Sequence, residues 1–351
     1  MIEDNPANVS SGEAVADGAE AVDDRLVEGN FKTYDQFENK LRPQNLVEYV
    51  GQAGIKANLG ISLQASLKRG EPLEHVLLYG PPGLGKTTLA GIIANEMGAN
   101  LKITSGPALE KQGDIVAILT NLQDGDVLFI DEIHRTKAPI EEVLYSAMED
   151  FCVDIIIGKG PSARSMRIQL PHFTLIGATT KVSMLSNPLH DRFGNIYKLQ
   201  FYSEEEIATI LLRSAKILGA KINEKAAERL ACASRRTPRI ANRLLRRVRD
   251  YAEIYDIAEI DLKSTEKTLD MLGIDILGLD QNDRELLITI AQKFRGGPVG
   301  LNTLSAATSE EEGTIEDMYE PFLLQLGFLE RTSKGRKITD RALEHLGINL
   351  F

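Results

Sequence analysis

The chain has 351 residues, of which 43% are apolar and 26% are charged, the ordinary balance of a soluble globular protein with two or three domains. No apolar run approaches the roughly 18 residues of a membrane span, and the N-terminus lacks the basic and then apolar pattern of a secretory signal. The two cysteines lie far apart and the five histidines are scattered, which argues against a disulfide framework or a zinc site. We therefore expect a cytoplasmic protein with no membrane contact.

The net charge of −11 would by itself argue against a nucleic-acid-binding protein, because phosphate contacts need Lys and Arg. The acidic residues are unevenly spread, however. Residues 1–30 hold eight acidic side chains and one basic one, and contribute −7 to the total. Because this segment has no apolar periodicity, we predict a disordered acidic tail. The rest of the chain is only mildly acidic, and its basic residues cluster.

Short apolar runs alternate with helically spaced segments between about residues 46 and 201. The expected strands are 75–79, 101–104, 126–130 and 173–178, and the expected helices are 88–97, 115–122 and 140–150. This alternation predicts an α/β domain, with a parallel sheet covered by helices on both faces. Residues 151–170 differ, since two apolar or alternating runs flank a segment with Gly and Pro, and they predict an inserted β-hairpin.

From residue 203 to the end of the chain, the spacing of apolar residues is different. Residues 203–273 are almost wholly helical in period, and Ser203 followed by Glu206 is a capping-box signal. Later, helices near 282–294, 301–308 and 314–326 lead into strands at 328–332 and 337–339. Helices followed by a small hairpin are typical of a winged helix-turn-helix. The expected domains are a tail (1–30), a sheet domain (31–202), a small helical domain (203–273) and a winged-helix domain (274–351).

Residues 80–87 read GPPGLGKT and match the phosphate-binding loop pattern with Gly80, Gly85, Lys86 and Thr87. An apolar strand precedes the loop and a helix follows it, which is the context that the pattern needs. The glycines let backbone N–H groups surround the phosphates, and the helix presents its positive end to the anion. Lys86 is expected on the β- and γ-phosphates and Thr87 on Mg²⁺. A chance glycine turn is the alternative, and the context disfavours it.

A second element follows at the spacing that the fold requires. The apolar run 127–130 ends in Asp131 and Glu132, at the carboxyl end of a predicted parallel strand, where α/β folds bind ligands. Asp131 is expected to orient Mg²⁺ or its waters, and Glu132 to act as the base or orienter for the attacking water. Two acids after a strand are common on their own. Beside the phosphate loop they predict hydrolysis of ATP or GTP.

Further polar groups are needed to neutralise the transferring phosphoryl group. Thr179 follows the strand 173–178, Arg192 lies on a loop after it, and Arg239 lies in a basic helix. Each also has an ordinary interpretation, as a strand-end threonine, a surface arginine or a solvated helix face.

Taken in order, GPPGLGKT, LFIDEIH, GATT, DRFG and TPRIANRLLRRVRD resemble the RuvB family, the bacterial Holliday-junction branch-migration ATPases of the AAA+ class. LRP at 41–43, TSGPALEK at 104–111, EEVLYSAMED at 141–150 and GGPVGL at 296–301 agree as well. The similarity covers about residues 40–347. Any AAA+ protein would share the first two motifs, whereas the long helix motif and GGPVGL are more specific. The implied architecture is an AAA+ P-loop sheet domain, a small helical lid and a C-terminal winged helix.

The resemblance implies a role for each nucleotide-site position. Leu41 and Arg42 would line the adenine pocket, with Tyr202 near the base or ribose. Thr179 would be the first sensor of the γ-phosphate, Arg239 the second sensor, and Arg192 an arginine finger for a neighbouring subunit. The remaining implied phosphate-binding residues are Gly83, Gly85, Lys86, Thr87 and Thr88.

The resemblance also implies partners. The family works as a homo-hexameric ring around duplex DNA, with a RuvA-like junction-binding protein and a RuvC-like resolvase in the wider complex. The apolar run Ile155, Ile156 and Ile157 in the hairpin would bind the RuvA-like protein, although a hairpin packed on its own domain is the ordinary interpretation of this run. Arg331, Lys334 and Arg336 would contact the phosphates of four-way junction arms independently of base sequence, although a solvated turn is the ordinary interpretation of this cluster.

Four positions depart from the family pattern. Arg236 stands where the family usually has Gly, His190 where it has Arg, Lys334 where the wing commonly has Arg, and Glu312 where a basic residue is frequent. A clamp-loader-like switch acting on a protein ring is the main alternative function, and a protein unfoldase is another. The sequence shows neither the helical collar of the first nor the aromatic pore loop of the second.

Overall fold

The structure is a computed structural model that describes residues 40–157 and 164–349. The predicted acidic tail lies outside the described residues, as do the side chains of Ile156 and Ile157. Residues 42–351 form one unit. In the described parts of the chain, no helix combines the length and apolar character needed to cross a membrane.

A five-stranded parallel sheet, in the order β2-β3-β6-β1-β7, forms the first domain. Its strands are β1 (Val76–Tyr79), β2 (Leu101–Ser105), β3 (Val127–Asp131), β6 (Thr174–Thr179) and β7 (Asn195–Lys198). The central strands β1, β3 and β6 are rich in buried aliphatic residues because both faces of a parallel sheet are covered. The predicted α/β fold with a parallel P-loop sheet is therefore confirmed.

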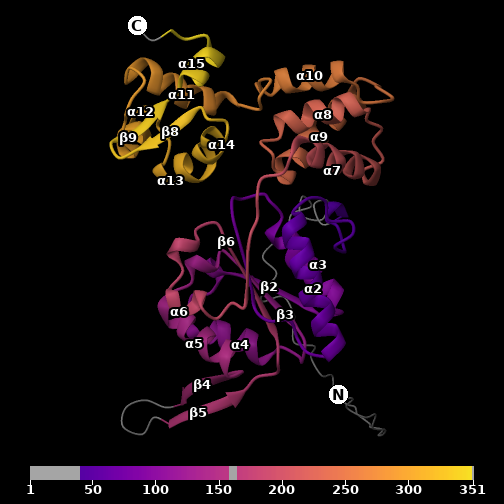
Figure 1. Ribbon diagram of the computed structural model, residues 1–351, viewed down its shortest axis with the longest axis vertical. Helices are drawn as coiled ribbons and strands as arrows, with labels where there is room; N and C mark the ends of the chain where they lie inside the picture. Colours follow the sequence, from indigo (N-terminus) through magenta and orange to yellow (C-terminus); the bar gives the residue numbers. More distant parts are fainter. Residues whose placement is uncertain (1–39, 158–163, 350–351) are drawn as a thin grey trace, which may run out of the picture. The chain divides into compact units, whose positions relative to one another are not determined.

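Helices cover both faces of this sheet (Figure 1). On one face lie α2 (Ala53–Arg69) and α3 (Lys86–Met97), whose buried residues share a core with Val127 and Phe129 of β3. On the other lie α4 (Gln112–Thr120) and α5 (Ala138–Glu149), packed with Leu128 and Ile130 of the same strand. The alternate residues of β3 thus enter two separate cores, as the twofold period of a strand requires.

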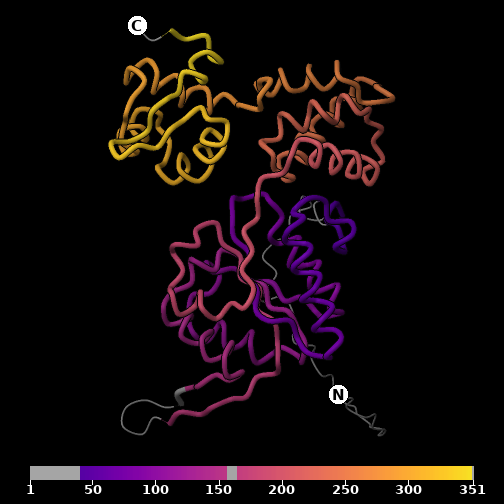
Figure 2. Tube along the Cα trace, viewed as in Figure 1, coloured from indigo at the N-terminus to yellow at the C-terminus, as the bar shows by residue number. Residues whose placement is uncertain are grey.

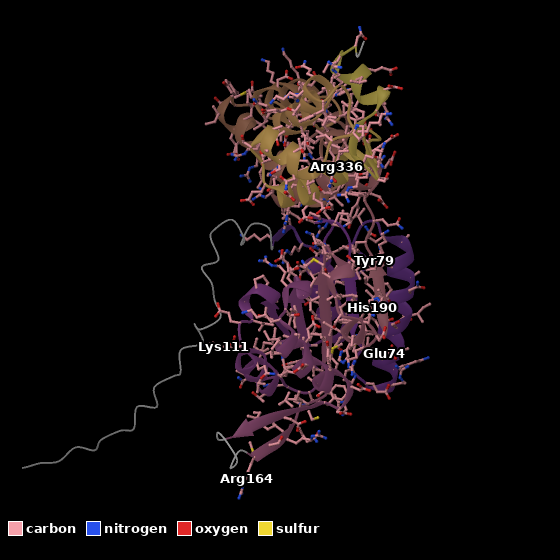
Figure 3. The ribbon with its side chains drawn as sticks, turned by 90° about the vertical axis from the view of Figure 1, so that its left-hand side faces the viewer. Glu74, Tyr79, Lys111, Arg164, His190 and Arg336 are labelled. Carbon is pink, nitrogen blue, oxygen red and sulfur yellow. The ribbon has the colours of Figure 1, made fainter. Side chains whose placement is uncertain are left out.

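A two-stranded antiparallel hairpin, β4 (Cys152–Ile157) and β5 (Arg164–Gln169), leaves the sheet domain and returns to it (Figure 2). Val153 near its base is buried, whereas β5 is largely exposed. Arg164 lies at the outer end of the hairpin (Figure 3). A hairpin anchored only at its base presents most of its side chains to a partner or to solvent.

The small second domain is helical. It comprises α7 (Glu204–Ile217), α8 (Glu224–Ala233), α9 (Pro238–Ile254) and α10 (Leu262–Met271). As the sequence predicts, Ser203 caps α7: its hydroxyl accepts from the Glu206 N–H at 3.2 Å, and the Glu206 carboxylate accepts from the Ser203 N–H at 2.8 Å. Pro238 begins α9, where its missing N–H costs no helical hydrogen bond.

The third domain has its own core. Its elements are α11 (Gln281–Lys293), α12 (Leu301–Thr308), α13 (Glu312–Thr314), the π-helical turn η6 (Ile315–Tyr319), α14 (Glu320–Gln325), β8 (Leu329–Thr332), β9 (Gly335–Ile338) and α15 (Asp340–Leu346). The predicted winged helix is confirmed, but the second wing strand begins at Gly335, two residues earlier than expected. The reason is tertiary: Arg336 exchanges backbone hydrogen bonds with Val299, and a Cβ at Gly335 would lie 2.3 Å from the Val299 carbonyl oxygen.

Asp283 at the start of α11 is buried and pairs with Arg235. Burial raises the pKa of Asp283 to about 7, although Arg235 opposes that shift. Because the folded state then holds the proton more tightly than the unfolded state, this residue's contribution to stability falls as pH rises from about 4 to about 7. Asp283→Asn, which mimics the neutral form, should gain stability relative to the wild type across that range in thermal unfolding. The exposed control Asp270→Asn should differ from the wild type in thermal stability by the same amount at every pH. The same pH-independent difference for Asp283→Asn would contradict the raised pKa of Asp283.

Candidate functional site

The phosphate loop joins the end of β1 to the start of α3, at the carboxyl edge of the sheet. Gly80, Gly83 and Gly85 have φ values of 139°, 81° and 96°, which lie in the region that favours glycine. A Cβ at Gly80 would lie 2.7 Å from the Leu199 carbonyl oxygen. These glycines let the backbone turn tightly at the N-terminus of a 12-residue helix, where an anion is stabilised.

Lys86, the first residue of α3, is only 8% exposed. Its Nζ donates to the carbonyl oxygens of Gly80 at 2.8 Å and Pro81 at 2.9 Å, so the ammonium lies within the loop. Burial lowers the pKa of Lys86 to about 8, and the nearby Asp131 carboxylate works against this shift. A phosphate group would supply the negative charge that this buried cation lacks.

Asp131 ends β3, which pairs with β2 on one side and β6 on the other. The Asp131 Oδ1 accepts from the Glu132 N–H at 2.9 Å, which fixes the turn between the two acids. Glu132 has φ 48°, a left-handed conformation that a residue with a side chain rarely adopts. The carbonyl of Glu132 lies against Gly106, where a Cβ would come within 2.4 Å of it. Gly106 therefore permits the turn that directs the Glu132 side chain.

Thr179 is the last residue of β6, and it is buried. The strand register places it opposite Tyr79, the residue before the phosphate loop, and the Gly80 N–H donates to the Thr179 carbonyl at 3.2 Å. The Thr179 hydroxyl lies 2.9 Å from His134 Nδ1. His134 lies two residues after Glu132, and partial burial lowers its pKa. Sequence reasoning gave His134 no role, although it stands within the LFIDEIH motif.

The start of α9 lies against the phosphate loop. The Arg239 N–H donates to the Gly83 carbonyl at 3.5 Å, and a Cβ at Gly83 would lie 3.3 Å from Arg239 Cβ. The Arg239 side chain is exposed, and its charge is near enough to lower the pKa of Lys86. Arg235 and Arg236 precede this helix with φ values of 52° and 54°. A left-handed φ is the conformation that glycine adopts most readily, so both arginines hold a strained backbone at the entry to α9.

Tyr202 is buried beneath the loop. Its hydroxyl donates to the Leu84 carbonyl at 3.2 Å and lies 3.2 Å from the Tyr49 hydroxyl, while its N–H donates to the Arg236 carbonyl. Burial raises the pKa of both tyrosines, so they stay neutral and hydrogen-bonded. Tyr202 thus supports the loop from below, and Tyr49 is a partner that sequence reasoning missed. Leu41 is buried but ends a separate unit, residues 1–41.

Arg192 has partners in its own sheet domain. Its guanidinium donates to Glu149 Oε2 at 2.7 Å and to the Pro188 carbonyl at 2.7 Å, and lies 4.7 Å from the centre of the Tyr145 ring. These partners belong to α5 and α6 (Asn187–His190) rather than to the phosphate loop. The geometry thus fits a cation presented outside its own nucleotide site.

Two oxygen-bearing side chains at the same edge of the sheet could take part in holding Mg²⁺. Within residues 40–157 and 164–349, no group of three or more His, Cys, Asp or Glu side chains could hold a metal ion. Mg²⁺ usually takes one or two protein oxygens together with phosphates and water. The Thr87 hydroxyl and the Asp131 carboxylate fit that demand, since Thr87 follows Lys86 and Asp131 is close enough to shift the pKa of Lys86.

The three wing residues differ in their surroundings. Lys334 is exposed in the two-residue turn between β8 and β9. Arg331 and Arg336 stand opposite each other on the two strands, and both bind the buried carboxylate of Glu320. Arg336 is labelled in Figure 3. The structure therefore brings the three predicted wing residues together, with Lys334 exposed to solvent and the two arginines paired with Glu320.

On the hairpin, Ile155 is half-buried and packs on the core beneath α5, opposite the exposed Met166. Of the predicted isoleucine run, this is the one side chain that falls within the described residues. It lies where the hairpin meets its domain, and Met166 extends the apolar strip along the paired strand.

Comparison with known proteins agrees along nearly the whole chain. Family models match residues 41–199 (Holliday junction DNA helicase RuvB P-loop domain), 202–275 (RuvB AAA lid domain) and 276–347 (RuvB C-terminal winged helix domain). A Holliday junction branch migration complex subunit RuvB from Dehalococcoides mccartyi is 58% identical over 326 residues, which span 93% of each chain. The solved Thermotoga maritima RuvB Holliday junction branch migration motor is 49% identical, with a TM-score of 0.82, over 89% of this chain and 100% of that one. A mutant of the same Thermotoga protein has the same identity and TM-score.

Proposed function

Because this chain belongs to the RuvB family, we propose that it is an ATP-driven DNA motor subunit that moves the branch point of Holliday junctions in homologous recombination and repair, together with a RuvA-like junction-binding protein. The observation that carries the proposal is the joining of a complete phosphate site to a winged-helix domain in one chain. The clamp-loader alternative has no comparable support.

The chemistry follows from the residues at the sheet edge. The loop N–H groups and Lys86 would bind the β- and γ-phosphates, with Gly83, Gly85 and Thr88 completing the loop. Thr87 and Asp131 would hold Mg²⁺, which neutralises phosphate charge when bound. Glu132 would orient the attacking water and accept its proton. Thr179 and Arg239 would contact the γ-phosphate from the sheet and from the lid, while Leu41, Arg42 and Tyr202 would lie on the adenosine side.

Assembly completes the site in this proposal. Arg192 would act on the nucleotide of a neighbouring subunit in a homo-hexameric ring, which is consistent with its partners lying outside its own phosphate loop. The hairpin would dock the RuvA-like protein through Ile155, Ile156 and Ile157. Lys334, Arg331 and Arg336 would contact the DNA backbone of junction arms. A RuvC-like resolvase would join the wider complex, and the cytoplasm would be the location.

Stimulation of ATP hydrolysis by DNA tests the coupling that the proposal requires. Adding closed circular duplex DNA to the purified chain should raise its steady-state hydrolysis rate, and a RuvA-like protein with a four-way junction should raise it further. A hydrolysis rate that neither addition changes would argue for a switch protein and against a DNA motor. Lys86→Ala serves as the control for contaminating ATPases, because it removes the phosphate-binding cation.

A further inference from the structure

Two carboxylates lie one helical turn apart and face the two arginines of the wing. Glu316 belongs to the π-helical turn η6 and Glu320 begins α14, so their side chains share a helix face. Arg331 and Arg336 are directly opposite on β8 and β9. Two like charges at such a cross-strand position repel each other, so the acids decide how these arginines are held.

The two acids bind the arginines in different ways. Glu320 is 0% exposed, and its two oxygens accept separately from Arg331 Nε at 2.6 Å and Arg336 Nε at 2.5 Å. Its Oε2 also pairs with Arg331 Nη2 and accepts from Arg336 Nη2 at 3.5 Å. Glu316 is 40% exposed and approaches only the terminal nitrogens, at 3.3 Å from Arg331 Nη2 and 3.8 Å from Arg336 Nη2. One carboxylate is therefore enclosed and closely bonded, and the other is reached by solvent and loosely bonded.

The charges of this cluster cancel, since two arginines face two glutamates. A guanidinium binds carboxylate and phosphate oxygens with similar geometry. Both acids contact the Nη2 atoms that a DNA phosphate would also bind, but only Glu316 is open to solvent, whereas the enclosed Glu320 also holds both arginines at Nε. The Glu316–Arg331 pair joins two exposed side chains, and such pairs are weak and screened by salt, so a phosphate can displace Glu316 from Arg331.

We propose that Glu320 is a positioning residue that fixes Arg331 and Arg336 on the wing, and that Glu316 is an exchangeable stand-in for a DNA phosphate. The inference rests on the proposed role of the wing in DNA binding. In this scheme the wing arginines are masked until the phosphate backbone replaces Glu316. The π-helical turn that carries Glu316 is a kind of distortion frequent at functional sites.

The test compares Glu316→Gln with Glu320→Gln, each of which removes one negative charge from the cluster. With the full-length protein, the Kd for a blunt duplex is measured by fluorescence anisotropy over a series of NaCl concentrations. Glu316→Gln should tighten binding several-fold, because it removes the competitor. Glu320→Gln should weaken binding several-fold and lower the salt dependence by about one phosphate contact, because an arginine loses its orientation. Glu344→Gln, on the exposed face of α15, is the charge-only control.

Equal tightening by both Gln variants would overturn the proposal, since net charge alone would explain it. If Glu320→Gln lowers the thermal midpoint, Glu320→Asp, which keeps the charge but shortens the reach, takes its place: weaker binding with a native midpoint supports positioning, and unchanged affinity contradicts it. Arg331→Ala and Lys334→Ala distinguish a failure of the proposed DNA-binding role of the wing from a failure of the inference about Glu316 and Glu320. If neither weakens DNA binding, the wing assignment fails and this inference fails with it. If both alanine variants weaken DNA binding but the two Gln variants change the Kd in the same direction, the wing assignment stands and only the inference about Glu316 and Glu320 fails.

Discussion

Glu132→Gln is expected to leave ATP binding close to the wild-type level while lowering the rate of hydrolysis by about 10²–10⁴-fold, the range that a positioned general base contributes. The amide keeps the size and much of the hydrogen bonding of the carboxylate but cannot accept the proton of the attacking water. The strained backbone at Glu132, supported by the close contact with Gly106, fixes the direction of this side chain. The measurements are nucleotide affinity by fluorescence and steady-state phosphate release.

Asp131 and Arg135 provide the comparison for this variant. Asp131→Asn should weaken both nucleotide-dependent Mg²⁺ binding and hydrolysis, which separates metal binding from water activation. Arg135 forms an ion pair with Glu132 at 3.0 Å on an exposed surface, so Arg135→Ala should change the rate little. Wild-type turnover in Glu132→Gln would remove Glu132 from the reaction.

Arg192→Ala is expected to lower hydrolysis by about 10³–10⁵-fold, the effect of an arginine supplied by a neighbour in other nucleotide hydrolases. Because the arginine would act across a subunit boundary, each variant subunit should impair the site of its neighbour. Mixing variant with wild-type protein should therefore reduce activity more steeply than the fraction of variant subunits. The measurement is ATPase activity at constant total protein over a series of mixing ratios.

The contacts of Arg192 supply a matched control. Glu149→Gln changes the closest acidic partner of Arg192 but keeps the arginine, so mixtures of this variant should follow the wild-type fraction far more closely. A linear response for Arg192→Ala would place its effect within its own subunit and contradict the role in a neighbour's site.

The parts of the site that the sequence predicts are those fixed by local chemistry. The phosphate loop needs its glycines and its lysine within eight residues, and Asp131 and Glu132 follow directly on a strand, so spacing alone identifies both. The residues that sequence reasoning missed act through tertiary contacts. His134 meets Thr179 across the sheet, Tyr49 meets Tyr202 over 153 positions, and Gly106 meets the Glu132 turn. No local periodicity encodes such pairs.

The wing illustrates the same limit. Counting basic residues at 331–337 predicts a DNA surface, and the structure adds that Arg331 and Arg336 share the buried Glu320. The early start of β9 also depends on Val299, which lies far from the strand in sequence. The charge pattern therefore gives the location of the basic cluster, whereas the pairing of its two arginines depends on Glu320 of α14.

Movement of a synthetic four-way DNA junction tests the central claim most directly. The chain is added to a fluorescently labelled junction with Mg²⁺, with and without ATP and a RuvA-like protein, and the separated duplex arms are measured over time. We expect dissociation that requires ATP, increases with the partner and disappears in Glu132→Gln. Steady ATP hydrolysis with no movement of the junction under any of these conditions would contradict a branch-migration motor.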